Sequence, residues 1–432
     1  MIQAGTCWSP PLKIWDPKPR KCVDVTSIVF LLTQSLDSPS GVGRYFPLAK
    51  QLVKLNYDVK IIALHPNYAE LPQKSFQSEG VSINYVAQMH VKKSDHLKSY
   101  YSAPRLVQIS LSAAWHLSRA AIKNKSDIII IGKPHPMNSI AGLIARIIHG
   151  GRLFLDCDDY ESESGRFSSK WQKSIISWFE KWVPKRVNSV LTNTFFMRDK
   201  LISWGVRQEK IIYLSNGVDA SRFQAPDFSE VNSLREEFCL GNKKVAGYIG
   251  SMSLPSHPVN LLLEAIAQLQ DQYPEICLLM VGGGEDLPAL IQQAQQLNIS
   301  NSTFFVGRVP PEKISNYYAL LDISIDPVYD NDAAKGRSPL KLFESWISHV
   351  PFISSDIGDR RILLGEPLAG MLANPGDPVS LADCIQKIIS APAYADELRH
   401  RGDQNVKSFT WEHLAAQFTV ELQSSLKEFQ HG

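Results

Sequence analysis

The sequence predicts an α/β protein in which two doubly wound, Rossmann-like domains face each other across a cleft. Length is the first reason, because 432 residues of which 44% are apolar can bury two sizeable cores. The second reason is order, since short apolar runs of strand length alternate with segments of helical period. This strand, helix, strand order occurs twice over, which is typical of two parallel sheets with helices on both faces.

The apolar runs give the positions of the expected strands. In the first domain they lie at 28–32, 59–64, 128–131, 153–155 and 190–192, and in the second at 211–214, 245–249, 277–281, 323–325 and 352–354. Helical segments separate them, and in one of these Tyr45, Leu48, Leu52 and Leu55 recur at intervals of three or four residues. Because ligands of such sheets bind outside the carboxyl ends of the strands, we expect the functional site in the cleft.

Three segments are expected along the chain. Residues 1–206 should form the N-terminal domain, residues 207–408 the C-terminal domain, and residues 409–432 a closing helical segment. The first 24 residues contain Pro10, Pro11, Pro17 and Pro19 and show no clear period, so they are predicted to form an irregular arm.

Composition narrows the class of protein. Lys and Arg (45) nearly balance Asp and Glu (43), and the net charge of +2 argues against a nucleic-acid binder, which would depend on attraction to phosphate. The six cysteines show no zinc-ligand spacing and indicate reduced thiols. No apolar run reaches the ~18 residues of a membrane span, and the N-terminus lacks a signal-peptide core, so we expect a cytoplasmic protein.

The segment Arg337-Ser-Pro-Leu-Lys-Leu-Phe-Glu344 is typical of a loop that turns into the N-terminus of a helix. Free backbone N–H groups and the helix dipole there can hold phosphate oxygens, and the charge of Lys341 can add to them. Glu344 can accept hydrogen bonds from a ribose diol. These features predict a site for a nucleotide diphosphate. The alternative is an amphipathic helix on which Lys341 and Glu344 form a surface pair.

Further motifs follow one another in a fixed order. They are the glycine-rich segment 35–45, Asn216-Gly-Val-Asp219, Gly247-Tyr-Ile-Gly250, Val281-Gly-Gly-Gly-Glu285, Phe305-Val-Gly-Arg308 and the segment 337–344. Over about residues 27–425, this set resembles the family 4 retaining glycosyltransferases. The resemblance implies the GT-B fold, with the donor nucleotide on the C-terminal domain and a last helix that crosses back to the N-terminal domain. It also implies metal-independent transfer of a hexose from a nucleotide diphosphate sugar to a saccharide or lipid-linked acceptor, with no other cofactor.

The resemblance assigns donor-binding roles to a set of residues, namely Gly41, Gly43, Gly250, Ser251, His257, Arg308, Arg337, Ser338, Leu340, Lys341 and Glu344. Three positions depart from the family pattern. Ser251 and His257 stand where an arginine and a lysine usually grip the diphosphate, and Gly336 stands where a glutamate usually meets the donor sugar. The phosphate charge would then be met by Lys335, Arg337, Lys341 and His257. Alternatively, these are solvated loop residues.

The acceptor side is predicted at Asp156-Cys-Asp-Asp159, which follows a short apolar strand. The family often has a histidine in this loop, and here Asp158 and Asp159 are the candidate catalytic residues that orient the acceptor and raise each other's pKa. Asp156 and His135 are expected to touch the acceptor. The alternatives are that Asp158 or Asp159 caps a helix and that His135 is an ordinary loop residue. A metal site is not expected.

Basic residues bracket an amphipathic pattern with aromatic edges over residues 91–125, which predicts peripheral contact with the inner membrane surface. The same stripe could instead pack on the sheet. Two other functions remain open. A nucleotide-sugar epimerase would place acids and histidines around one sugar, and a non-catalytic binding or scaffold protein would explain the absent arginine, lysine and glutamate.

Overall fold

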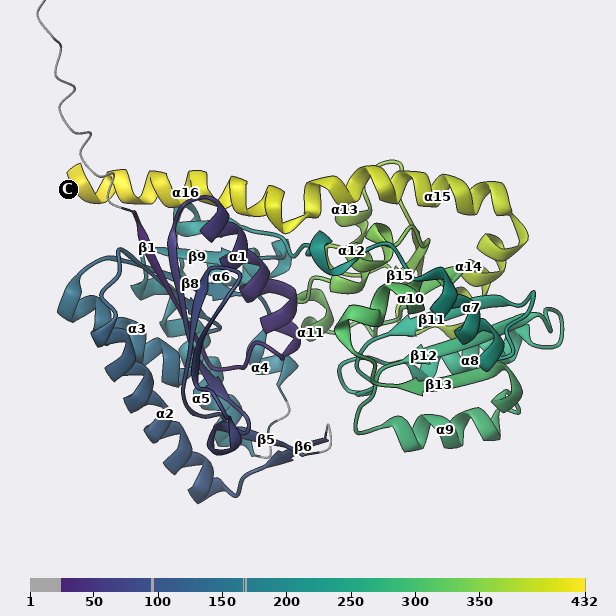
Figure 1. Cartoon of the computed structure of the whole chain (residues 1–432), viewed down its shortest axis with the longest axis horizontal. Helices are drawn as coiled ribbons and strands as arrows, with labels where there is room; N and C mark the ends of the chain where they lie inside the picture. Colours follow the sequence, from purple (N-terminus) through teal and green to yellow (C-terminus); the bar gives the residue numbers. More distant parts are fainter. Residues whose placement is uncertain (1–24, 95–96, 166, 168, 432) are drawn as a thin grey trace, which may run out of the picture.

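The computed structural model describes residues 25–431 except for 95–96, 166 and 168. The described chain forms two α/β domains that lie side by side, each built on a parallel sheet covered by helices (Figure 1). The predicted fold class is therefore confirmed. The expected arm over residues 1–24 lies outside the described residues.

The N-terminal sheet has eight strands in the order β10-β9-β8-β7-β1-β2-β4-β3, and only the edge strand β3 is antiparallel to its neighbour. Its strands are β1 (Ser27–Leu32), β2 (Asp58–His65), β3 (Ser75–Ser78), β4 (Val81–Gln88), β7 (Ile128–Gly132), β8 (Arg152–Cys157), β9 (Ser189–Thr192) and β10 (Ile211–Tyr213). A separate hairpin pairs β5 (Val91–Ser94) with β6 (Leu97–Tyr100). The buried apolar side chains of β1 alternate between the two faces of the sheet, so each face carries its own core.

The C-terminal sheet has six parallel strands in the order β13-β12-β11-β14-β15-β16. They are β11 (Lys244–Ile249), β12 (Ile276–Val281), β13 (Thr303–Gly307), β14 (Ile323–Asp326), β15 (Phe352–Ser355) and β16 (Met371–Ala373). The central strand β12 is buried along its whole length, as a parallel strand covered on both faces requires.

Helices cover both sheets. In the N-terminal domain they are α1 (Phe46–Lys54), α2 (Ala103–Lys123), α3 (Pro136–His149), α4 (Glu161–Ser164), α5 (Lys170–Trp182) and α6 (Phe195–Ser203). In the C-terminal domain they are α7 (Phe228–Glu237), α8 (Asn260–Leu269), α9 (Leu287–Gln296), α10 (Ile314–Tyr318), α11 (Asp332–Lys335), α12 (Leu340–Ile347), α13 (Arg360–Leu364), α14 (Pro378–Ser390) and α15 (Pro392–Asn405). The last helix, α16 (Trp411–His431), lies along the N-terminal domain (Figure 1).

The chain crosses between the domains later than the sequence predicted. β10 pairs with β9 and is the edge strand of the N-terminal sheet, so the expectation that the run at 211–214 opens the C-terminal sheet is wrong. The expected boundary at 206/207 precedes the last N-terminal strand. The two crossings meet where Val218 bridges Thr410. Beyond them, Trp411 and Phe418 of α16 are buried in the N-terminal core.

Helix α2 has two apolar faces. Ile109, Ala113 and Leu117 are buried against the sheet. On the other face Leu111 and Trp115 are 68% and 67% exposed. Packing on the sheet, which was the alternative for this stripe, therefore uses only part of its apolar surface. Within the described residues, no helix is long and apolar enough to cross a membrane.

Candidate active site

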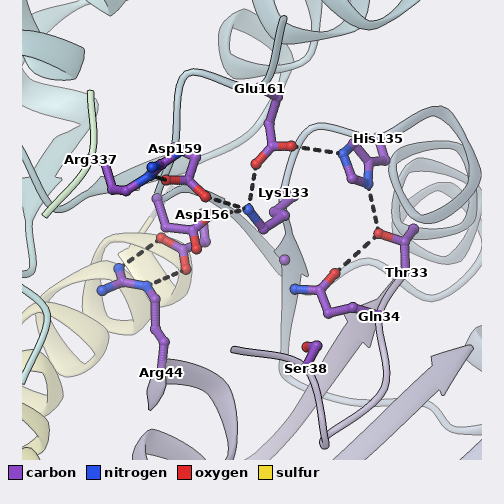
Figure 2. A network of polar contacts seen from close by, with 12 residues as sticks. Thr33, Gln34, Ser38, Arg44, Lys133, His135, Asp156, Asp159, Glu161 and Arg337 are labelled. Atoms are coloured by element: carbon purple, nitrogen blue, oxygen red, sulfur yellow. Dashed lines mark hydrogen bonds and ion pairs between the residues drawn. The ribbon is translucent and has the colours of Figure 1, made fainter. Parts of the chain in front are cut away.

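Loops after three neighbouring strands build one side of the site. The strands β1, β7 and β8 lie next to one another in the N-terminal sheet, so their carboxyl ends open at the same edge. The loop after β1 carries Thr33 and Gln34, the loop after β7 carries Lys133 and His135, and Asp156 lies at the end of β8 (Figure 2). This edge faces the loop of the C-terminal domain that carries Arg337.

Lys133 lies at the centre of this side. Its Nζ is 2.8 Å from Asp159 Oδ2 and 3.3 Å from Asp158 Oδ1, and it also pairs with Glu161 (Figure 2). Burial disfavours the charged form of Lys133, but the three carboxylates outweigh burial and raise its pKa well above the usual range. The sequence pointed to the two loops that carry Lys133 and Glu161, but it assigned roles only to His135 and the aspartates and none to these two residues. Their signal was position, because both lie just after strand ends.

The acids of this cluster differ in charge state. Burial raises the pKa of Asp158 to about 7, against the attraction of Lys133 and with a smaller contribution from Asp159. Burial also opposes ionisation of Glu161, but Lys133 and His135 outweigh it and lower the pKa of Glu161 below its usual range. Asp158 is thus the acid that can exchange a proton near neutral pH.

Neither aspartate caps a helix. The N-cap residue of helix α4 is Tyr160, and its side chain makes no capping hydrogen bond. The backbone N–H of Glu161 instead donates to Glu180 Oε1 of α5 at 2.7 Å. The capping alternative for Asp158 and Asp159 therefore does not hold.

His135 is held at both ring nitrogens. Nδ1 is 2.7 Å from Thr33 Oγ1, and Nε2 is 3.1 Å from Glu161 Oε2 (Figure 2). An ionised carboxylate can only accept a hydrogen bond, so Nε2 must carry a proton. His135 is more than an ordinary loop residue, because these contacts fix its ring beside the acid cluster.

Asp156 does not fit its expected role. It forms a two-bond ion pair with Arg44, with Nε to Oδ2 at 2.6 Å and Nη2 to Oδ1 at 2.8 Å, and both side chains are 2% exposed. Arg44 also donates to Asn216 Oδ1 at 2.9 Å and to the Leu214 carbonyl at 3.2 Å, both in the first interdomain crossing. Asp156 is therefore occupied in holding the domains together rather than directed toward an acceptor. Arg44 was not among the residues expected in the site.

On the C-terminal side, Lys341 lies in the first turn of α12. Its Nζ is 3.0 Å from Asp326 Oδ1 and 4.9 Å from the centre of the Tyr248 ring. Its side chain also covers Gly250, where a Cβ would lie 2.6 Å from Lys341 Cε. The surface pair with Glu344 is therefore not the role of Lys341. Glu344 instead accepts a hydrogen bond from the Tyr318 hydroxyl at 3.3 Å.

The loop before α12 reaches the N-terminal domain. Arg337 Nη1 donates to the Ser256 carbonyl at 2.8 Å, and its Nε is 3.8 Å from Asp159 Oδ1 across the domain boundary (Figure 2). Ser338 is 3% exposed, and no partner for its hydroxyl occurs among the described residues. The Arg337 guanidinium and the Ser338 hydroxyl are hydrogen-bond donors, so they suit a ligand whose oxygens accept hydrogen bonds.

Glycines allow two close approaches between the domains. A Cβ at Gly43 would lie 2.6 Å from Leu340 Cδ1, and a Cβ at Gly336 would lie 2.9 Å from Tyr160 Cβ. The place where the family usually has a glutamate is thus filled by a contact with the other domain. Gly41 begins a π-helical turn, and its N–H donates to Ser38 Oγ at 3.1 Å.

One of the expected phosphate contacts, His257, lacks the charge that the role requires, and a second, Lys335, already has a carboxylate partner. Burial, followed by repulsion from Lys341 and Arg337, lowers the pKa of His257 well below its usual range, so its ring is neutral. Lys335 is paired with Asp330 at 2.7 Å, as expected of a solvated loop lysine. The lowered pKa argues against a positive charge on His257, and its place in the donor site stays a prediction. Ser251 is exposed and uses its carbonyl to accept from the Tyr248 hydroxyl.

A small cavity of about 70 Å³ lies between the domains. Its lining includes Gly165 from one domain and Ser256, Tyr329 and Arg337 from the other. Arg308 lies farther along the C-terminal domain beside Gly283, where a Cβ would be 3.3 Å from its side chain. Asp158, Asp159 and Glu161 place carboxylate oxygens within 4.8 Å of one another, and the Lys133 ammonium contacts all three. The expected absence of a metal stays a prediction.

Comparison with known proteins gives two family matches. The model described as "Glycosyltransferase Family 4" matches residues 39–222, and the model described as "Glycosyl transferases group 1" matches residues 243–391. D-inositol 3-phosphate glycosyltransferase of Corynebacterium jeikeium is 26% identical over 204 residues, which cover 45% of this chain and 47% of that protein. The chain thus spans about half the length of this curated relative.

Solved structures share the architecture. Sucrose-phosphate synthase from Thermosynechococcus elongatus superposes with a TM-score of 0.75 at 16% identity, covering 94% of this chain and 100% of that one. HepE of Anabaena, in complex with UDP and glucose, gives a TM-score of 0.70 at 18% identity, covering 92% of this chain and 100% of that one. At such identities the likeness concerns the fold alone.

Proposed function

Since family models match both of its halves, this chain belongs to the family 4 glycosyltransferases, and on that premise we propose that it transfers a hexose from a nucleotide diphosphate sugar to a saccharide or lipid-linked acceptor. Its two domains have the GT-B fold. The observation that carries the proposal is the opposition of Arg337 and Asp159, 3.8 Å apart, where donor-side cations meet acceptor-side acids.

The donor side supplies the groups that a diphosphate needs. Lys341 and Arg337 bring positive charge, the first turn of α12 brings free backbone N–H groups, and the Ser338 hydroxyl lacks a partner among the described residues. In this proposal Glu344 accepts hydrogen bonds from the ribose. HepE, whose structure holds UDP and glucose, supports a uridine nucleotide as the first donor to try.

The proposed transfer retains the anomeric configuration of the sugar. The bond from the anomeric carbon to the diphosphate oxygen breaks while the acceptor oxygen attacks from the same face. The acceptor proton passes to the leaving diphosphate or to Asp158, whose raised pKa suits a base near neutral pH. Lys341 and Arg337 stabilise the charge that develops on the diphosphate. No metal takes part.

The test measures release of nucleoside diphosphate from a panel of nucleotide sugars, with binding of the matching diphosphates followed by thermal shift. A ligand at 100 times its Kd should stabilise the fold by about 2.7 kcal/mol. Release together with a glycoside product of retained configuration supports the proposal, whereas an inverted product contradicts the retaining step.

The same measurements separate the other functions. The neutral His257 and the Gly336 contact favour a scaffold protein as second candidate, because both remove groups that the family uses. A scaffold would show no stabilisation by any nucleotide. An epimerase would change the sugar of the nucleotide without releasing the diphosphate.

A further inference from the structure

A continuous chain of polar contacts crosses the acceptor side. It runs from Gln34 through Thr33 and His135 to Glu161 and ends on Lys133 (Figure 2). The contacts join the loops after β1, β7 and β8, which are neighbours in the sheet. Because the sheet fixes these loops, the groups are held in place before any ligand arrives.

Along this row of polar contacts, acidic groups outnumber basic ones. Lys133 is one ammonium in contact with the three carboxyl groups of Asp158, Asp159 and Glu161. Arg337 also reaches Asp159, at 3.8 Å, but it lies on the donor side. A bound diphosphate would add negative charge close by and compete for Arg337. The acceptor side therefore has a surplus of negative charge when the donor is bound.

Gln34 provides a second, independent observation. Its side chain is 6% exposed, and its Oε1 lies 3.2 Å from Thr33 Oγ1. Within the described part of the chain, no group accepts a hydrogen bond from its Nε2. Figure 2 shows this nitrogen turned away from Thr33, toward the side of the site that holds Asp156 and Arg44. A buried amide donor without a partner is costly, and a ligand oxygen would relieve that cost.

An unsatisfied acceptor lies in the same site. Asp158 Oδ1 is buried, and apart from the ion pair with Lys133 at 3.3 Å no hydrogen bond to it occurs among the described residues. A hydroxyl group both donates and accepts, so neighbouring hydroxyls can satisfy an amide donor and a carboxylate acceptor together. A phosphate group can use the amide but is repelled by the carboxylates.

We propose that Gln34, Lys133, His135, Asp158, Asp159 and Glu161 form a subsite for an uncharged polyol, meaning a saccharide or cyclitol unit whose hydroxyls carry no phosphate. The inference rests on the proposed function and specifies its acceptor. The carboxylates accept hydrogen bonds from the hydroxyls, and Gln34 donates to one hydroxyl oxygen. An anionic acceptor unit is rejected by the carboxylate surplus.

Matched acceptor pairs test the proposal on the full chain. Methyl glucoside, methyl mannoside and myo-inositol are each compared with their monophosphates, at saturating donor, by the rate of diphosphate release above the rate with water. The uncharged member of a pair should show a kcat/KM at least about tenfold higher. The proposal is overturned if a phosphorylated member equals or exceeds its partner, or if no uncharged polyol stimulates release at concentrations far above a usual KM.

Variants of the subsite residues test whether they cause the preference for uncharged over phosphorylated acceptors. Gln34→Ala should raise the KM for the uncharged polyol about tenfold, more than it lowers kcat, whereas Gln108→Ala on the exposed face of α2 is the matched control. Glu161→Gln should narrow the preference for uncharged over phosphorylated acceptors, with Asp199→Asn as the surface control. An unchanged preference in Glu161→Gln, with the variant folded by circular dichroism, contradicts the proposal.

Failure of this inference can be told from failure of the proposed function. Release of diphosphate to water reports the donor reaction alone, so a protein that hydrolyses the donor but prefers phosphorylated acceptors overturns only the inference. Calorimetric titration of the same polyols and phosphates into the protein with bound nucleoside diphosphate gives a reading without turnover. Tighter binding of the phosphates there would overturn the polyol subsite directly.

Discussion

Lys133 has a backbone φ of 71°, in a region that side-chain-bearing residues rarely adopt. Such a conformation persists only where the surroundings determine it, and here the ammonium is fixed by the carboxylates of Asp158, Asp159 and Glu161. The single ammonium offsets part of the acid charge. It also leaves Asp158, the most buried of these acids, with a proton that is lost near neutral pH.

Asp158 should set the pH dependence of transfer. Its pKa of about 7, raised mainly by burial, means that the carboxylate able to accept the acceptor proton forms as pH rises through 7. We therefore expect kcat/KM to increase across this range. Asp158→Asn should lower the rate about 10²-fold and remove the increase, whereas Asp199→Asn should leave it in place. A pH–rate profile that keeps its increase in Asp158→Asn would contradict this role.

The same shift affects stability with a definite sign. Between the unfolded value of 3.8 and about 7, the folded Asp158 carboxyl keeps a proton that the unfolded chain has released. The free energy of unfolding should therefore fall as pH rises through this window. Urea titrations of Asp158→Asn should show a smaller fall than those of the wild type, and an identical pH dependence would argue against the raised pKa.

Glu344 should hold the donor ribose. Glu344→Ala removes a charged hydrogen-bond acceptor, so the Kd for the nucleoside diphosphate should rise at least tenfold, or about 1.4 kcal/mol. Glu312→Ala, on the exposed surface of the same domain, is the matched control. Calorimetry on both folded variants measures this Kd. An unchanged Kd in Glu344→Ala would contradict the predicted contact between Glu344 and the ribose.

At the scale of elements, the loop and first turn of α12 gather the groups proposed to bind the diphosphate. Lys341 is held ready by Asp326, whose own pKa, despite burial, is lowered to about 2 by Lys341 and Arg360. The pair means that a bound diphosphate must share Lys341 with an ionised carboxylate. Arg337 is similarly shared with Asp159.

Neutralising either cation should weaken the donor site. Lys341→Ala and Arg337→Ala should each raise the Kd for the nucleoside diphosphate and flatten its dependence on salt, because one charged contact is lost. Lys335→Ala is the control, since Lys335 pairs with Asp330 instead. If both variants bind like wild type at every salt concentration, the diphosphate is held elsewhere.

The strand β10, which was expected in the C-terminal sheet, belongs to the N-terminal sheet because of its pairing. The apolar run at 211–214 follows a helix, as any strand of either domain would, so its sequence carries no sign of its sheet. Its place was decided by pairing with β9. The interdomain crossing then begins at Leu214, whose carbonyl is bound by Arg44.

At the scale of the whole molecule, Arg44 joins three parts of the fold. It ties Asp156 at the end of β8 to the crossing at Leu214 and Asn216, and the Trp411 ring of the second crossing lies 5.9 Å away. Asn216 in turn donates to the Ser338 carbonyl on the donor side at 3.4 Å. A movement of one domain relative to the other would therefore change contacts on both the acceptor side and the donor side of the site.

The N-terminal domain is proposed to contact a membrane surface through α2. Leu111 and Trp115 are exposed there, and Arg105, Arg119 and Lys123 lie on the same helix. Flotation should recover more protein with anionic than with neutral vesicles, and Leu111→Ser with Trp115→Ser should abolish recovery. A matched change on another exposed surface, Phe228→Ser, should not. Equal recovery with both vesicle types would contradict the contact.

The sequence by itself determined the fold class, the order of most strands and the place of the 337–344 segment. These are local properties, because periodicity, apolar runs and helix starts depend on residues near one another in the chain. The ordered motifs also identified the family that the comparisons show. They pointed to the loops of the site but not to all of its contacts.

Tertiary structure decided which of those residues meet. Lys133 and Glu161 join the acids only because β7 and β8 are neighbours, and Asp156 is withdrawn from the site only because Arg44, distant in sequence, lies beside it. The neutrality of His257 likewise follows from its burial beside Lys341. Adjacency of strands, burial and nearby charge are long-range properties, and the charge and partner of each site residue depend on them.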